Sequence, residues 1–184
     1  MNKMLERNTK LAVTALAMMV LLACGGLSEA EEYYNQGIDF VDSGDFETAI
    51  ASYTKSIELD PDFANAYINR GVAYKELGLY ERAVEDYTKA IELDPDYAEA
   101  YYNRGYTYLN LEQYARALED FTDTIVLNPD YAGTYINRGV TYEYLGLYGK
   151  ALKDYNKAIE LDPNNELAIN NREWLLNEYP YLEE

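Results

Sequence analysis

The sequence contains no histidine and only one cysteine among its 184 residues. Histidine is the usual general base at neutral pH and the commonest transition-metal ligand, so its absence excludes hydrolase triads and histidine-based metal sites. The single cysteine, Cys24, cannot form a disulfide within the chain. The sequence also lacks a G-x-x-x-x-G-K-[ST] phosphate loop and a dinucleotide-binding fingerprint. We therefore expect a protein that is not an enzyme and that holds no cofactor and no metal.

Basic residues are scarce as well, with 15 lysines and arginines against 33 acidic residues and a formal net charge of −18. Residues 1–23 carry three basic residues and one acidic residue, so the remaining chain carries −20. Phosphate and anionic lipid are recognised by clustered lysine and arginine, so we expect no nucleic acid partner and no electrostatic attachment to a membrane. An acidic surface of this kind favours a neutral or basic protein partner.

The first residues have the layout of a secretory signal. Residues 1–10 are short and basic, and residues 11–23 form a 13-residue apolar run, which is too short to span a bilayer comfortably. The run ends at Leu21-Leu22-Ala23-Cys24, which resembles the lipobox of bacterial lipoproteins. The resemblance implies that residues 1–23 are a lipoprotein signal peptide and that a lipid is attached to Cys24 after cleavage. A plain signal peptide cut nearby and an uncleaved anchor remain as alternatives.

A lipid on Cys24 would anchor the protein to a membrane of the bacterial cell envelope after export. Residues 24–29 would then form a tether that reaches at most roughly 20 Å, which keeps the folded part close to the membrane. In some lineages an aspartate after the cysteine retains lipoproteins at the inner membrane. This chain has Gly25 there, which favours the outer membrane if the host is didermic.

Four consecutive segments of equal length share one skeleton. Alignment on their glycines divides the chain into units 30–63, 64–97, 98–131 and 132–165. Aromatic residues stand four places before and three places after each glycine, so in the second unit Tyr67, Gly71 and Tyr74 share one stripe of a helix. A glycine on that stripe allows a second helix to approach closely. A proline stands two places before the end of each unit; it disfavours helical conformation in the residue before it and so ends a second helix.

This skeleton resembles the tetratricopeptide repeat, a helix-turn-helix unit of the same length. The resemblance implies an all-α fold, an α-solenoid of four such repeats, because stacked units bury the apolar stripes that single units cannot. Residues 166–184 would form a capping helix and tail, with Trp174 anchored against the last unit. Ser56 and Thr124 replace the usual alanine and Glu112 replaces a turn glycine, so we expect looser packing at these places.

One face of the first helices points away from the core. With roughly 100° per residue, Asn69 lies opposite Tyr67, whereas Arg70 lies at the border of the core. In the tetratricopeptide family this face lines a concave groove that binds extended peptides or partner helices. The predicted groove residues are Tyr34, Asn35, Ile68, Asn69, Val72, Tyr102, Asn103, Tyr106, Ile136, Asn137 and Val140. The recurring asparagines either hold a peptide backbone, as asparagine ladders do in some family members, or bond within the array.

The arginine that follows three of these asparagines has an acidic counterpart at a constant spacing, on the second helix of its own unit. The pairs are Arg70 with Asp86, Arg104 with Asp120, and Arg138 with Asp154. The first unit has Gln36 and Ser52 at these two places, so the basic and the acidic residue are lost together. This pattern predicts an ion pair within each of the last three repeats.

Together these features predict a membrane-tethered interaction module, an adaptor or scaffold whose groove binds an extended peptide or helix of another envelope protein. Family members that hold acidic chaperone tails use lysine and arginine beside the asparagines. This chain has Tyr34, Ile38 and Glu99 at those places, which excludes that ligand. The alternative is a structural role in which the array associates with itself and acts as a spacer in an envelope assembly.

Overall fold

The computed structural model describes residues 27–183 and contains, within that range, α-helices, one final 3-10 helix and no strand. The helices are α2 (Glu29–Asp42), α3 (Phe46–Leu59), α4 (Ala64–Glu76), α5 (Tyr80–Leu93), α6 (Ala98–Asn110), α7 (Tyr114–Leu127), α8 (Ala132–Tyr144), α9 (Tyr148–Leu161), α10 (Glu166–Glu178) and η1 (Pro180–Glu183). The predicted all-α fold is confirmed. The predicted signal peptide and the lipid site at Cys24 lie outside the described residues.

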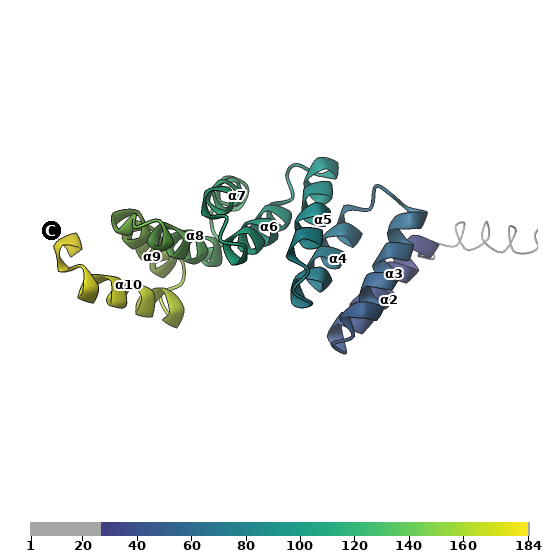
Figure 1. Cartoon of the computed structure of the whole chain (residues 1–184), viewed down its shortest axis with the longest axis horizontal. Helices are drawn as coiled ribbons and strands as arrows, with labels where there is room; N and C mark the ends of the chain where they lie inside the picture. The colour runs from purple at the N-terminus through teal and green to yellow at the C-terminus, as the bar shows by residue number, and fades with distance from the viewer. Residues whose placement is uncertain (1–26, 184) are drawn as a thin grey trace, which may run out of the picture.

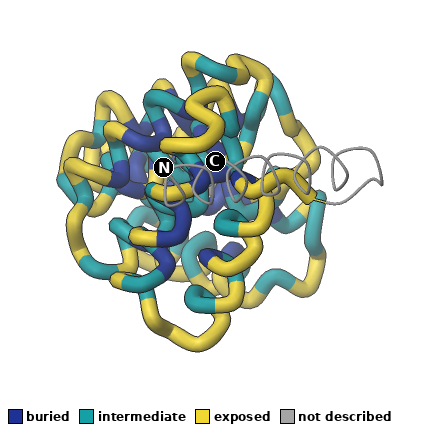
Figure 2. Tube along the Cα trace, turned by 90° about the vertical axis from the view of Figure 1, so that its right-hand side faces the viewer, coloured by how far each residue is buried: buried dark blue, intermediate teal, exposed yellow. Residues whose placement is uncertain are grey.

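The helices form consecutive hairpins, α2 with α3, α4 with α5, α6 with α7, and α8 with α9. The second helix of each hairpin also packs on the first helix of the next, and α9 packs on α10. Figure 1 shows the hairpins following one another along the long axis, from α2 at one end to α10 at the other. Seen along that axis in Figure 2, the trace winds around a centre where buried residues gather. This is the predicted α-solenoid of four repeats with a further helix at its end.

Local sequence explains where the helices begin and end. Helix α2 begins one residue before the predicted start of the first unit, at Glu29, because Ser28 and Glu31 form a capping box. The second helices α3, α5, α7 and α9 end directly before the Asp-Pro or Asn-Pro of each unit. In three turns between paired helices a glycine adopts a positive φ, as Gly78 does at 72°. In the third repeat Glu112 adopts φ 58° at the same place.

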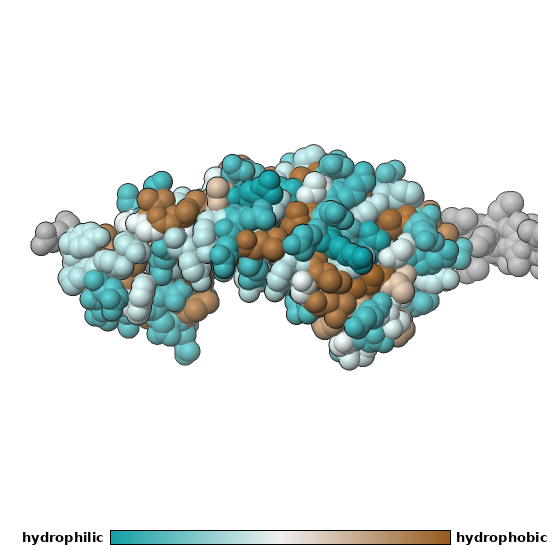
Figure 3. All heavy atoms as spheres, in the orientation of Figure 1, coloured by the Kyte–Doolittle hydropathy of each residue, from teal (hydrophilic) through white to brown (hydrophobic). Residues whose placement is uncertain are grey.

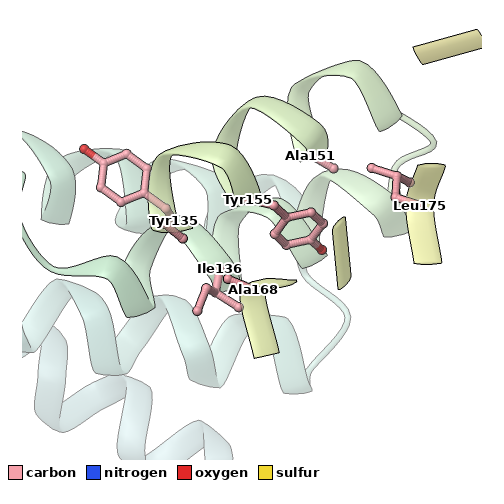
Figure 4. Packing of buried hydrophobic residues seen from close by; sticks show 7 residues of the cluster. Tyr135, Ile136, Ala151, Tyr155, Ala168 and Leu175 are labelled. Atoms are coloured by element: carbon pink, nitrogen blue, oxygen red, sulfur yellow. The ribbon is translucent and has the colours of Figure 1, made fainter. Parts of the chain in front are cut away.

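An aromatic residue of each second helix fills the middle of each hairpin. Tyr53, Tyr87, Phe121 and Tyr155 are at most 1% exposed. A Cβ added at Gly71 would lie 2.7 Å from Cε1 of Tyr87, so only glycine admits this ring. The expected close approach at the repeated glycine is therefore confirmed. In the last repeat Tyr155 lies in the middle of a cluster with Ile136 and Ala168, whereas the hydroxyl of Tyr135 points away from it (Figure 4).

The three predicted ion pairs are present, and each is bidentate. Arg70 donates from Nε to Oδ2 of Asp86 at 2.8 Å and from Nη2 to Oδ1 at 2.7 Å. Its Nη1 donates to the hydroxyl of Thr54 at 3.0 Å, on the second helix of the preceding repeat. The same three bonds recur for Arg104 and Arg138, with Thr88 and Thr122 as the threonines. Each arginine thus joins its own hairpin to the previous one.

Trp174 is not anchored against the last unit as predicted, because its side chain is 50% exposed. Leu175, the next residue along α10, is fully buried in the core cluster of the fourth repeat instead. The ring of Tyr179 stacks on Tyr148 with centroids 3.9 Å apart, and η1 contacts α9. Leu175 and Tyr179 stand four residues apart, so one stripe of α10 covers α9 and leaves the indole outside.

Candidate functional site: the groove of the first helices

The first helices α2, α4, α6 and α8 contact one another in sequence and carry the predicted groove residues. Tyr106 is 37% exposed and Asn35 is exposed, whereas Val72 and Val140 are half-buried beside the core clusters. Lys75 lies over the ring of Tyr106, with its Nζ 5.4 Å from the centroid. On the face drawn in Figure 3, hydrophobic residues form separate patches among hydrophilic ones. The predicted groove residues themselves combine apolar side chains such as Val72 with polar ones such as Asn35.

Two predicted groove residues do not reach the surface. Ile68 is 2% exposed and packs among Tyr87, Ala90 and Ala100, and Ile136 is 4% exposed in the core of the fourth repeat. Helix geometry alone puts each isoleucine at the border between the outward face and the core, roughly 100° from the core tyrosine before it. An isoleucine at that border packs against the next hairpin, as Ile68 packs against Ala100 on α6. Both side chains stabilise the stack and are unavailable to a partner.

Two of the asparagines bond within the array. Nδ2 of Asn69 donates to the hydroxyl of Tyr34 at 2.9 Å, and Nδ2 of Asn137 donates to the hydroxyl of Tyr102 at 3.0 Å. Each bond joins the first helix of one repeat to the first helix of the repeat before it. These two amides therefore hold neighbouring first helices together, which is one of the two roles left open by the sequence.

Asn103 differs from them. The residue at the matching place of the preceding repeat is Ile68, which offers no hydroxyl, and among the described residues the Asn103 side chain makes no hydrogen bond. The side chain is half-buried on α6, the middle of the array. Tyrosine and isoleucine alternate as Tyr34, Ile68, Tyr102 and Ile136. The residue before each of the asparagines therefore alternates with a period of two repeats, and so does the hydrogen bond from the next repeat that it can accept.

The two tyrosines of this alternation are centres of aromatic clusters. Tyr34 lies 4.8 Å from Phe63 and 5.8 Å from Tyr53, measured between ring centroids. Tyr102 lies 5.2 Å from Tyr131 in an edge-on arrangement. Burial raises the pKa of Tyr34, and burial together with the neighbouring Tyr131 raises the pKa of Tyr102 to about 12. Both phenols therefore keep their protons at neutral pH and act as neutral hydrogen-bonding groups.

A cavity of about 320 Å³ opens in the third repeat, and we call it the repeat-3 cavity. Helix α6, the end of α7 and the loop that follows contribute its lining. The lining residues are Ala98, Glu99, Tyr102, Asn103, Thr124, Asn128 and Tyr131. It contains one carboxylate, two amides, two phenols and no basic group. The cavity lies beside Thr124, where the sequence predicted loose packing.

A second cavity, of about 410 Å³, lies where α8 meets α10. Val140, Glu143, Tyr144, Tyr148, Asn171 and Trp174 line it. Glu143 accepts a hydrogen bond from the hydroxyl of the buried Tyr155. Burial raises the pKa of Glu143, and the bond from Tyr155 acts in the opposite direction. This cavity combines one carboxylate with three aromatic rings, of which Trp174 is half exposed.

Sequence reasoning missed the tyrosine partners of Asn69 and Asn137 and the threonine partners of the arginines. Both sets of contacts cross from one repeat to the next, so no comparison within a single unit reveals them. A signal was present in each case. The tyrosines recur in every second unit, as Tyr34 and Tyr102, and the threonines recur at Thr54, Thr88 and Thr122.

Residues 27–183 contain no group of three or more acidic or cysteine side chains placed to hold a metal ion. None of the helices in the same range combines the length and the apolar character that crossing a membrane requires. The contacts of the groove are hydrogen-bonding and aromatic groups, which suit the recognition of a protein surface.

Family models match four stretches of the chain. The model described as TPR repeat matches residues 37–78 and 73–112, and the model described as tetratricopeptide repeat matches residues 98–131 and 132–165. These stretches cover more than half of the 184 residues. Neither model indicates an enzyme. A search of curated proteins finds no match.

Solved structures with the same fold include two MamA proteins. A crystal structure of MamA is 29% identical, with a TM-score of 0.75, over 80% of this chain and 81% of that one. MamA from Desulfovibrio magneticus RS-1 is 23% identical, with a TM-score of 0.79, over 85% of this chain and 89% of that one, which shows the fold alone.

A third similar structure contains a bound peptide. It is the first TPR of Spaghetti (RPAP3) bound to the HSP90 peptide SRMEEVD. It is 31% identical to this chain, with a TM-score of 0.61, over 62% of this chain and 91% of that one. Matched by the family models over its four units, the chain belongs to the tetratricopeptide-repeat family, a family of protein-interaction modules.

Proposed function

We propose that the protein is a membrane-tethered adaptor whose groove binds an extended peptide or helix of another cell-envelope protein. The observation that carries the proposal is the first-helix face around α6, where the side chain of Asn103 makes no hydrogen bond within the described residues and Tyr106 is exposed. The repeat-3 cavity is lined by α6, the second cavity is lined by α8, α9 and α10, and both contain aromatic and polar groups. Aromatic rings and unpaired amides are the groups that give peptide-binding surfaces their affinity.

The charge of the groove indicates the character of the partner. Each cavity contains a carboxylate, Glu99 in one and Glu143 in the other, and neither is lined by a lysine or arginine. An acidic tail such as the HSP90 peptide bound by Spaghetti would meet like charge here. We infer a neutral or basic segment, which the net charge of −18 would also attract.

Membrane tethering is the second part of the proposal, and it depends on Cys24. The supporting feature is the basic and apolar segment that ends in Leu-Ala-Cys, with a folded array that starts shortly after it at Ser28. Replacing Cys24→Ser should move the protein from the membrane fraction to the soluble fraction after export. Retention of the variant at the membrane would refute the lipid anchor.

Affinity capture from solubilised membranes tests the groove. The groove variant Asn103→Ala/Tyr106→Ala changes two side chains of α6 that face the groove, and Asn69 and Asn137 are kept because they hold helices together. The matched control Glu119→Ala/Val126→Ala changes two exposed residues of α7. We expect the groove variant to lose partners that the wild type and the control retain. Equal capture by all three proteins would contradict the proposal.

Self-association is the second candidate, and one observation favours it. The last helices, α10 and η1, expose Leu167 at 58%, Trp174 at 50% and Tyr181 at 63%. These large hydrophobic and aromatic side chains are available to contact another copy of the chain. If this end joins copies of the chain, then Leu167→Ser/Trp174→Ser should reduce the mass measured in detergent by light scattering. The groove variant Asn103→Ala/Tyr106→Ala should leave that mass unchanged.

A further inference from the structure

Three groups that line the repeat-3 cavity differ from the residues at the matching places of the other repeats. Glu99 takes part in no hydrogen bond or ion pair among the described residues, whereas the matching Glu31 accepts a hydrogen bond from the backbone of Ser28 at 2.6 Å. The second and fourth repeats have Asn65 and Gly133 at this place. The only carboxylate at this position that is available to a ligand therefore belongs to the third repeat of the described array.

The other two groups follow from the surrounding contacts. Asn103 is not bonded to a tyrosine, as Asn69 and Asn137 are, so its side-chain amide lines the cavity without a hydrogen-bond partner within the described residues. Asn128 ends α7 where the other repeats have aspartate, and its neutral amide adds a second carbonyl oxygen. The cavity thus offers acceptors from α6 and from the end of α7.

We propose that the repeat-3 cavity receives an arginine side chain of the bound partner segment. The Glu99 carboxylate would accept two hydrogen bonds from the guanidinium, and the carbonyl oxygens of Asn103 and Asn128 would accept others. A guanidinium carries five N–H donors in one plane and stacks on aromatic rings, which the ring of Tyr131 provides. This proposal rests on the proposed function, because the arginine belongs to the segment that the groove binds.

Arginine fits better than the alternatives. A lysine ammonium is a compact, strongly hydrated charge with three donors. It would leave some of the acceptors of Glu99, Asn103 and Asn128 without a hydrogen bond. A carboxylate would be repelled by Glu99. A neutral isostere such as citrulline keeps the shape and most of the hydrogen bonds but loses the attraction to the carboxylate. The charged planar group is therefore the feature that the cavity selects.

The test uses small probes, so it does not depend on knowing the partner. N-acetyl-arginine N-methylamide, its lysine analogue and its citrulline analogue are titrated separately into the full-length protein in a neutral detergent. Chemical shifts of the side-chain amides of Asn103 and Asn128 report binding. We expect the arginine probe to bind about fivefold more tightly than the citrulline probe, because one half-exposed ion pair contributes about 1 kcal/mol. Its affinity should fall as salt is added.

Glu99→Gln should lower the affinity for the arginine probe by about fivefold and leave that for the citrulline probe unchanged. Glu99 is exposed, so the variant should fold as the wild type does. Glu31→Gln is the matched control, because it removes the same charge at the matching place of the first repeat. It should leave the affinity for the arginine probe unchanged. Equal binding of arginine and citrulline, or full binding by Glu99→Gln, would overturn the proposal.

Partner capture separates this inference from the function that it refines. If Asn103→Ala/Tyr106→Ala loses its partner while Glu99→Gln retains it fully and the arginine probe does not shift the two amides, then the groove binds a partner without an arginine in this cavity. If the probe binds as expected but the groove variant captures the same partners as the wild type, the cavity prefers arginine and the groove function is wrong.

Discussion

The first and third repeats share an aromatic cluster and differ in how their hairpins are held. Tyr34 packs on Phe63 and Tyr53, and Tyr102 packs on Tyr131 and Phe121 in the same way. The first repeat has Gln36 and Ser52 and contains no arginine ion pair. Its hairpin packs more closely, with Gly37 against the ring of Tyr53.

The third repeat has the ion pair that the first repeat lacks, and its hairpin packs less closely at the glycine. Arg104 holds Asp120 with two hydrogen bonds, Gly105 lies less tightly against Phe121, and the repeat-3 cavity is open beside Thr124. A hairpin that is joined by an ion pair tolerates a gap that a hairpin held by close packing alone would not. We infer that the ion pair of the third repeat stabilises a hairpin that has a cavity beside it.

The largest effect is expected from breaking that ion pair. Arg104→Ala leaves the carboxylate of Asp120, whose side chain is 4% exposed, without its partner, so the free energy of unfolding should fall by about 3 kcal/mol. Gln36→Ala, the matched change in the first repeat, should stay within about 0.5 kcal/mol. Urea denaturation followed by circular dichroism measures both.

A double-mutant cycle sharpens this prediction. Once Arg104 is gone, Asp120→Ala removes an unpaired buried charge, so its further cost should be smaller than in the wild type. The coupling free energy between the two residues should be at least about 1 kcal/mol. Strict additivity of the two substitutions would mean that the bidentate contact contributes nothing to stability.

The next effect concerns the glycines. A Cβ at Gly37 would overlap the ring of the buried Tyr53, whereas at Gly105 its nearest contacts, Cβ of Asp120 and Cδ1 of Phe121, would lie 3.0 and 3.1 Å away. Gly37→Ala should therefore lower stability by about 1 to 2 kcal/mol, the cost of overpacking less the gain in helix propensity. Gly105→Ala should change it by less than about 1 kcal/mol. Urea midpoints that fall equally would contradict the difference in packing.

Substitutions in the turns should change the stability by smaller amounts, with a gain in the third repeat and a loss in the first. Gly44 has φ 80°, and Glu112 has φ 58° in the matching turn. A non-glycine residue in this left-handed region is strained, so Glu112→Gly should raise stability by about 0.5 to 1 kcal/mol. Gly44→Ala should lower it by about 1 kcal/mol for the same reason. Thermal unfolding measures both, and a loss of stability in Glu112→Gly would show that the turn is unstrained.

Much of this architecture could be predicted from the sequence, because the constant period shows the same contacts within a unit several times. The spacing between Arg70 and Asp86, which recurs in the next two units, was enough to predict an ion pair, and the glycine stripe was enough to predict a close helix contact. Both contacts lie within one hairpin, so their residues recur at the same spacing from one repeat to the next.

Contacts between repeats were not predictable in this way. Ile68 lay on the border between the groove and the core by helix angle alone, and only the position of the next hairpin decides that it is buried. Trp174 and Leu175 are adjacent on α10, and only the orientation of that helix on α9 decides which one is covered. The repeat-3 cavity depends on side chains from two helices and a loop, and no single spacing in the sequence describes it.

The last prediction concerns the hydroxyl that distinguishes Tyr53 from Phe121. Burial, followed by the proximity of Tyr34, raises the pKa of Tyr53 to about 12. A folded-state pKa above the unfolded value of 10 means that Tyr53 contributes a stability that is complete below pH 10 and is lost as the pH rises through about 12. Tyr53→Phe makes the first repeat resemble the third in this respect. Its melting temperature should fall less than that of the wild type between pH 9 and roughly pH 11. The reciprocal Phe121→Tyr should steepen that fall, and parallel curves for all three proteins would show that folding does not raise the pKa of a phenol at either place.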